Sequence, residues 1–177
     1  NMIERGQIDY GMIVDAESSR FLVESTIERL KRPETDLQTF RDEFASLTTG
    51  SGAVAMILAR SDLVPDGHRF RGTFSLAATE HNRLCVGQLE RGITDTKGLM
   101  VEGVELSRKT WAGARKHLGF EATEVDQYCL HQVSQRHAEQ LAASLELDVE
   151  KTLLIVDLFG NVGPASVPIV LSKALDL

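Results

Sequence analysis

Apolar residues follow two different spacings along this chain, and the two spacings alternate from one end to the other. Short continuous apolar runs, which are typical of buried strands, occur at 10–14, 53–58, 128–130 and 153–156. Apolar residues three and four positions apart predict helices over 18–31, 97–118 and 134–145, and a last one near the end of the chain. Strands that alternate with helices in this way predict an α/β fold built of packed layers.

Proline and glycine mark where the predicted helices begin and end. Pro33 closes the first helix, and Gly119 is placed to end the long second one, because glycine readily adopts the left-handed conformation that follows a helix. A proline such as Pro168 is tolerated only in the first turn of a helix. The last helix should therefore begin close to Pro164.

The composition is that of an ordinary globular protein, with 42% hydrophobic and 25% charged residues among 177. The net charge of −7 argues against nonspecific nucleic-acid binding. No apolar run reaches the ~20 residues that a membrane-spanning helix needs. Because the chain starts at Asn1 and no signal peptide follows, we expect it to be part of a longer, cytoplasmic protein.

Two polar residues, His131 and Asn161, each follow a predicted strand and precede a predicted helix, 30 residues apart. The ends of parallel strands are where α/β proteins bind ligands, so the two side chains could converge on one pocket. A neutral imidazole and a carboxamide can both donate a hydrogen bond to an oxygen that becomes negative. The alternative is that His131 is a loop histidine and that Asn161 only tolerates a turn after Gly160, and the spacing leaves both interpretations open.

The two cysteines, Cys85 and Cys129, form no CxxC pair, so neither a zinc site nor a redox motif is predicted. Cys129 lies two residues before His131 and could be its partner, but a small core residue is the interpretation we favour. Cys85 lies near His81, where a structural or pocket-lining role is favoured over a reactive dyad. We therefore expect no metal site and no catalytic cysteine within this chain.

The other histidines and the arginines show no pattern that marks a site. We interpret His68, His117 and His137 as surface or satisfied histidines. The turn at 50–52 lacks the lysine and hydroxyl residue of a phosphate-binding loop and predicts tight strand packing instead. The arginines that could contact phosphates, as on any solvated face, are Arg20, Arg60, Arg69, Arg71 and Arg83, so cofactor-binding residues stay unassigned.

Four segments of the chain carry a family resemblance. "LHQVSQRHAEQLAASLEL" followed by "FGNVGPASVPIVLSKAL" resembles the beta-ketoacyl-acyl-carrier-protein synthase III group of the thiolase superfamily, whose His-Gln and Gly-Asn pairs have this separation. "LTTGSGAVAMILAR" and "MIERGQIDYGMIVDAE" resemble parts of its N-terminal half. The resemblance implies a thiolase-like layered α/β fold (α-β-α-β-α), incomplete here. Residues 1–62 would end the N-terminal half, and 63–177 would form the C-terminal half without its last strands.

Two departures from the usual synthase III motifs point to one branch of the family. His131-Gln132-Val133-Ser134 stands where His-Gln-Ala-Asn is usual, and Val162-Gly163-Pro164 follows Gly-Asn. These motifs and "HNRLCVG" at 81–87 resemble OleA-type enzymes, which join two fatty acyl chains head to head. The resemblance implies an acyltransferase that carries out a Claisen condensation of two acyl thioesters.

The resemblance also implies roles for residues inside and outside this chain. His131 and Asn161 would be catalytic and stabilise the enolate or oxyanion, and Gln132 would orient the histidine loop. The nucleophilic cysteine and the glutamate base would lie upstream of Asn1, so this piece alone should not condense acyl groups. No cofactor is implied, because coenzyme A arrives as part of the thioester substrate.

Two alternative functions stay open, and the resemblance also implies an oligomeric state. The first alternative is decarboxylative synthase III activity in fatty-acid initiation, with an acyl-carrier-protein thioester as partner. The second is a non-catalytic piece that only binds an acyl ligand or a partner subunit. The superfamily resemblance further implies a homodimer acting in lipid metabolism.

Overall fold

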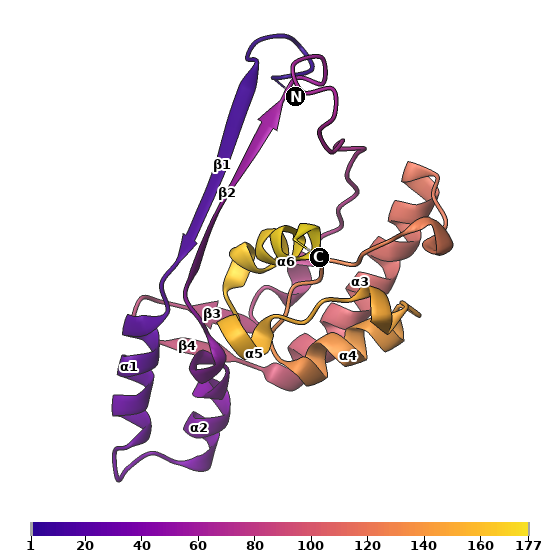
Figure 1. Cartoon of the computed structure of the whole chain (residues 1–177). Coiled ribbons are helices and arrows are strands. Elements are labelled where there is room, and N and C mark those ends of the chain that lie inside the picture. The colour runs from indigo at the N-terminus through magenta and orange to yellow at the C-terminus, as the bar shows by residue number, and fades with distance from the viewer. Residues whose placement is uncertain (1, 177) are drawn as a thin grey trace.

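The computed structural model describes residues 2–176, and its most prominent feature is a long antiparallel ribbon (Figure 1). Strand β1 (Tyr10–Glu17) pairs with β2 (Gly52–Ala59) over their whole length, from Tyr10 opposite Ala59 to Glu17 opposite Gly52. A second, smaller hairpin joins β3 (Cys85–Gly87) to β4 (Gly92–Thr94). The mixed α/β content that the sequence predicts is therefore confirmed.

Two helices and a 3₁₀ turn connect the long strands and lie at one end of the ribbon (Figure 1). They are α1 (Arg20–Leu30), α2 (Leu37–Glu43) and η1 (Phe44–Thr48). Helix α2 begins where the Asp36 carboxylate accepts a hydrogen bond from the Thr39 amide at 2.7 Å, which satisfies one of the free N–H groups of the first turn.

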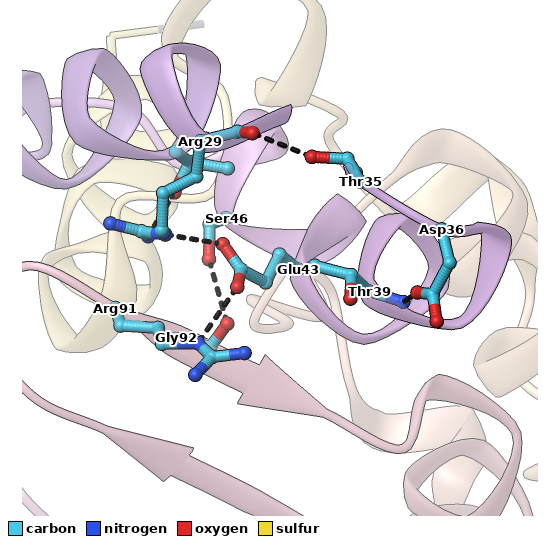
Figure 2. Close-up of polar contacts among 9 residues, drawn as sticks. Arg29, Thr35, Asp36, Thr39, Glu43, Ser46, Arg91 and Gly92 are labelled. Atoms are coloured by element: carbon cyan, nitrogen blue, oxygen red, sulfur yellow. Dashed lines mark hydrogen bonds and ion pairs between the residues drawn. The ribbon is translucent and has the colours of Figure 1, made fainter. Parts of the chain in front are cut away.

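A buried carboxylate ties this helical pair to the small hairpin (Figure 2). The Glu43 side chain has no exposed surface, and its two oxygens accept hydrogen bonds from Arg29 Nε at 2.9 Å and Arg91 Nε at 2.7 Å. Nearby, the Ser46 hydroxyl donates to the Gly92 carbonyl. A buried charge needs such pairing, so these contacts fix α1, α2 and β4 relative to one another.

The remaining helices follow in the second half of the chain. Helix α3 ends at Gly119, whose φ of 68° is the left-handed conformation that glycine adopts most easily. Ser134 caps α4 by accepting a hydrogen bond from the His137 amide at 3.1 Å. The helices are α3 (Thr96–Leu118), α4 (Gln135–Ser144), α5 (Val156–Phe159) and α6 (Ser166–Leu175). The short 3₁₀ turns are η2 (Thr79–His81), η3 (Ala122–Glu124), η4 (Val149–Lys151) and η5 (Gly163–Ala165).

Two small apolar clusters form the core of the described residues. The first gathers α5, η5 and α6 and consists of Ile155, Val162, Ala165, Ile169 and Val170. The second joins the start of one loop to α4 and consists of Tyr128, Ala142 and Leu147, with Trp111 of α3 packed edge-on against the Tyr128 ring. His131 follows Tyr128 of the second cluster, and Asn161 directly precedes Val162 of the first.

The predicted helices are confirmed to within about two residues at each end, and the last one does begin just after Pro164, as a 3₁₀ turn that leads into α6. The predicted strands need correction. Residues 10–14 and 53–58 are strands, but they are not buried: Met12 is 68% and Ile57 69% exposed. Segments 128–130 and 153–156 do not form strands; the pairing near them is a single parallel bridge between Tyr128 and Thr152, the residue before the second segment.

Two further expectations concern the division of the chain into halves and the absence of a membrane-spanning helix. The division into 1–62 and 63–177 stays a prediction. No helix between residues 2 and 176 combines the length and apolarity that crossing a membrane requires.

Candidate functional site

His131 and Asn161 lie in separate loops that meet at the backbone of Gly163. The Asn161 side-chain oxygen Oδ1 accepts a hydrogen bond from the Gly163 amide at 3.2 Å. The His131 ring lies within hydrogen-bonding reach of the backbone of the same residue, and this interaction raises the pKa of the ring. The structure therefore brings together the two residues that the sequence singled out.

Partial loss of water contact favours the neutral form of the His131 imidazole. Loss of water contact lowers the pKa of His131 below its ordinary value, and the adjacent Gly163 backbone offsets part of this effect. A neutral imidazole still carries one N–H and can donate a hydrogen bond. The residue as a whole remains exposed, so a ligand can reach it.

The backbone of Asn161 is held by a parallel bridge to the chain just before β2. Its amide donates to the Thr48 carbonyl at 2.9 Å, and its carbonyl accepts from the Gly50 amide at 2.8 Å. A side chain at position 50 could not fit, because a Cβ there would lie 1.7 Å from the Phe159 carbonyl oxygen. The 50–52 turn is thus the close packing of two segments that the sequence predicted.

Gln132 fixes the histidine loop from inside the protein. Its side chain is fully buried; Nε2 donates to the Leu153 carbonyl at 2.7 Å, and Oε1 accepts from the Ile155 amide at 2.8 Å and from the Val156 amide at 3.1 Å. Its own amide donates to the buried Ser166 hydroxyl at 3.3 Å. These contacts agree with the orienting role expected for Gln132, since they join the loop after Tyr128 to the start of α5 and α6.

Replacing Gln132 by leucine should destabilise the protein by at least about 2 kcal/mol. The change leaves the buried Ile155 amide, the partly buried Val156 amide and the partly buried Leu153 carbonyl without a partner, and a fully buried unpaired group costs about 1–3 kcal/mol. Urea unfolding measures the loss. The matched control is Gln135→Leu, because Gln135 is exposed and its side chain, within the described part of the chain, bonds only to Glu139 of its own helix. Equal unfolding free energies for the two variants would contradict this account of Gln132.

Cys129 has the core setting that the sequence favoured, whereas Cys85 lies on the surface. Cys129 packs against the first core cluster, and burial raises the pKa of its thiol, which works against a nucleophilic thiolate. Cys85 is exposed with its sulfur 3.5 Å from the Thr94 hydroxyl. His81 instead pairs with Glu102 at 3.3 Å. Within the described residues no group of three or more His, Cys, Asp or Glu side chains could hold a metal ion.

His137 is a residue that the sequence interpretation missed. It is half-buried, and its Nδ1 is buried with no hydrogen-bond partner in the described part of the chain, so it is not the satisfied histidine expected. Burial first, and the charge of nearby His131 second, lower the pKa of His137. Its place three residues after the helix-capping Ser134, on the turn that follows His131, was the available signal.

Three of the five arginines considered as phosphate ligands are already engaged. Arg20 pairs with Glu24, and Arg60 pairs with Asp9 and Asp62. Arg69 donates to three backbone carbonyls of its own loop. These contacts agree with leaving them out of the site.

A cavity of about 670 Å³ between α2 and the start of α3 offers a different set of cations. Arg41 and Lys97 line it, and neither has an ion pair or side-chain hydrogen bond among residues 2–176. The rings of Phe40 and Phe44, 5.6 Å apart, lie beside them. Cations next to aromatic rings are suited to a ligand that combines phosphate groups with an aromatic base.

Comparison with known proteins finds relatives over nearly the whole chain. Residues 116–176, which carry both His131 and Asn161, match the family model described as 3-oxoacyl-[acyl-carrier-protein (ACP)] synthase III C terminal. An acyl-CoA:acyl-CoA alkyltransferase of Xanthomonas campestris is 47% identical over 176 residues, which is 99% of this chain and 52% of that protein. One of Shewanella oneidensis is 36% identical over 99% of this chain and 54% of its own length.

A beta-ketoacyl-[acyl-carrier-protein] synthase III of Sphingopyxis alaskensis is 25% identical over 77% of this chain and 44% of its own length. Crystal structures of Xanthomonas campestris OleA, including one with bound lauric acid and lauroyl-CoA, are 46% identical to this chain and superpose with a TM-score of 0.96. They cover 99% of this chain, which spans about half the length of the relatives it matches. The expected thiolase-like fold is thereby confirmed for the part present. Residues 116–176 thus carry a 3-oxoacyl-[acyl-carrier-protein] synthase III C-terminal domain, and the chain as a whole is similar to about half of OleA.

Proposed function

We propose that the full-length protein is an acyltransferase that joins two acyl-CoA molecules head to head by Claisen condensation. The observation that carries this proposal is the similarity to acyl-CoA:acyl-CoA alkyltransferases over 99% of the chain. The meeting of His131 and Asn161 at Gly163 supports it, because the reaction needs hydrogen-bond donors at a carbonyl oxygen that becomes negative.

The reaction has two stages. A cysteine thiolate outside this chain attacks the first thioester carbonyl, and the coenzyme A thiol leaves. The second acyl-CoA then loses a proton from its α-carbon, and the resulting carbanion attacks the enzyme thioester and releases the cysteine thiolate. The product is a two-chain β-ketoacyl-CoA, whose hydrolysis gives the β-keto acid.

The residues of this chain act on the developing negative charge. Because Gly163 holds Oδ1 of Asn161, the carboxamide nitrogen Nδ2 points away from that turn, and it makes no hydrogen bond within the described residues. It is free to donate to a thioester oxygen. The neutral His131 ring supplies a second donor. Each such donor typically contributes about 3 kcal/mol to lowering the barrier of acyl chemistry.

The proposal also covers how the substrate binds and how the full-length protein assembles. The cavity at Arg41 and Lys97 is suited to the phosphorylated end of a coenzyme A thioester. We place the full-length protein in the cytoplasm, in fatty acyl metabolism, as a homodimer. Sedimentation of the full-length protein as a monomer would count against this assembly.

The second candidate function is decarboxylative synthase III activity, which the similarity to the Sphingopyxis enzyme supports more weakly, at 25% identity. Product analysis of the full-length protein separates the two. With long-chain acyl-CoA as the sole substrate, we expect free coenzyme A and a two-chain β-keto acid. Carbon dioxide released from a malonyl donor, with no two-chain product, would overturn the proposal in favour of synthase III chemistry.

A further inference from the structure

Glu17 is the last residue of β1 and lies at the point where the ribbon reaches the candidate site. It pairs with Gly52 in the register of the ribbon, and β1 packs against the η5 turn. Its side chain is half-buried, and between residues 2 and 176 it makes no hydrogen bond and no ion pair. Within these residues the Glu17 carboxylate therefore does not stabilise the fold through an ion pair, and it is not a fully exposed surface group either.

The Glu17 side chain lies next to Gly163. A Cβ placed on Gly163 would lie 3.2 Å from the Glu17 Cδ and 3.3 Å from its Oε1. The carboxyl group therefore closes off the space in which a side chain of residue 163 would stand. At φ of 53°, Gly163 is also in the left-handed region, where residues other than glycine are disfavoured.

Gly163 is the residue that links the two proposed oxyanion donors. Its amide holds Oδ1 of Asn161, and its backbone lies beside the His131 ring. A shift of this turn toward Glu17 would move the Gly163 amide and with it the Asn161 carboxamide that it holds. The Glu17 carboxyl next to the turn limits that movement.

We propose that Glu17 is a positioning residue, which fixes the Gly163 turn by packing and so holds Asn161 in the orientation needed for condensation. This role rests on the condensation function proposed above. The shape of the side chain carries it rather than the charge, because a carboxylate would oppose the negative charge that the neighbouring donors stabilise.

Three variants of the full-length protein test this role: Glu17→Ala, Glu17→Gln and the control Glu28→Ala. Glu28 is an exposed glutamate of α1 whose side chain makes no hydrogen bond or ion pair within residues 2–176. The measurements are the burst of coenzyme A release, which reports cysteine acylation, and steady-state β-keto acid formation as a function of acyl-CoA concentration.

We expect Glu17→Ala to lower the kcat of condensation at least about tenfold, because small misplacements of catalytic groups have effects of this size or larger. The acylation burst and KM should stay within about twofold of wild type, since only the second stage uses the Asn161 orientation. Glu17→Gln, which keeps the shape, should restore most of the kcat, and Glu28→Ala should match wild type.

Two results would overturn the role of Glu17 while leaving the proposed function standing. One is a wild-type kcat for Glu17→Ala, and the other is a loss in Glu17→Gln as large as in Glu17→Ala. If Glu17→Ala does not fold, Glu17→Asp replaces it; its shorter side chain should lower kcat by an intermediate factor, and an unchanged kcat counts against the role. A wild-type protein that makes no two-chain product would overturn the proposed function itself.

Discussion

Replacing Glu43 by alanine is expected to lower the free energy of unfolding by about 3–5 kcal/mol, the usual cost of removing one partner from a buried ion pair. Glu43 has no exposed side-chain surface and binds two guanidinium groups, one from α1 and one from the residue before β4. Its loss leaves Arg29, whose side chain is only 21% exposed, without its carboxylate (Figure 2). Urea unfolding followed by circular dichroism measures the change.

A matched control separates burial from ion pairing as such. Glu24→Ala removes the partner of Arg20 on the surface of α1, where both side chains are mostly exposed. Exposed pairs of this kind contribute about 0–1 kcal/mol, so this variant should unfold close to wild type. If the two alanine variants lose the same stability, Glu43 does not have the linking role that its contacts indicate.

The second large effect concerns the reaction itself. In the full-length protein, His131→Ala and Asn161→Ala should each slow condensation by about 10²–10³-fold, the typical cost of removing one oxyanion donor. Acylation of the cysteine should fall much less, because the proposed donors act on the oxygen of the second thioester. Single-turnover coenzyme A release measures acylation, and β-keto acid formation measures condensation.

Control variants for this experiment come from exposed residues of the same types. Asn82→Ala and His68→Ala change an asparagine and a histidine outside the proposed site and should leave both stages unaltered. Equal losses of acylation and condensation in His131→Ala and Asn161→Ala would mean that the proposed division of labour is wrong. The His131→Ala and Asn161→Ala proteins must first show the wild-type unfolding transition, so that a lower rate reports a change in chemistry and not in folding.

Much of the local structure could be predicted because its causes are local. The helix over 134–145 was predicted from apolar spacing, and its start depends on a contact between Ser134 and His137, three residues apart. The end of the long helix depends on the freedom of Gly119 to take a left-handed conformation. Such interactions lie within one turn of helix, so the order of residues is enough to determine them.

The strands were harder to predict for the opposite reason. A strand forms only where another backbone pairs with it. Tyr128 pairs with Thr152 at one bridge, and residues 153–155 lead to the start of α5 without forming a strand. The ribbon strands were predicted as strands, but their exposure was not, because a continuous apolar run does not say what packs on it.

By itself, the sequence determined the helices, the two polar residues at loop starts, and the motifs that indicated a synthase III-like family. Only the tertiary structure decided which groups meet: Glu43 with Arg91, 48 positions later, Gln132 with the start of α5, and Glu17 with the turn that joins His131 to Asn161. These contacts join residues far apart in sequence, and the packing of several elements at once sets them. No periodicity or spacing encodes them, because each depends on the loops and strands between the partners.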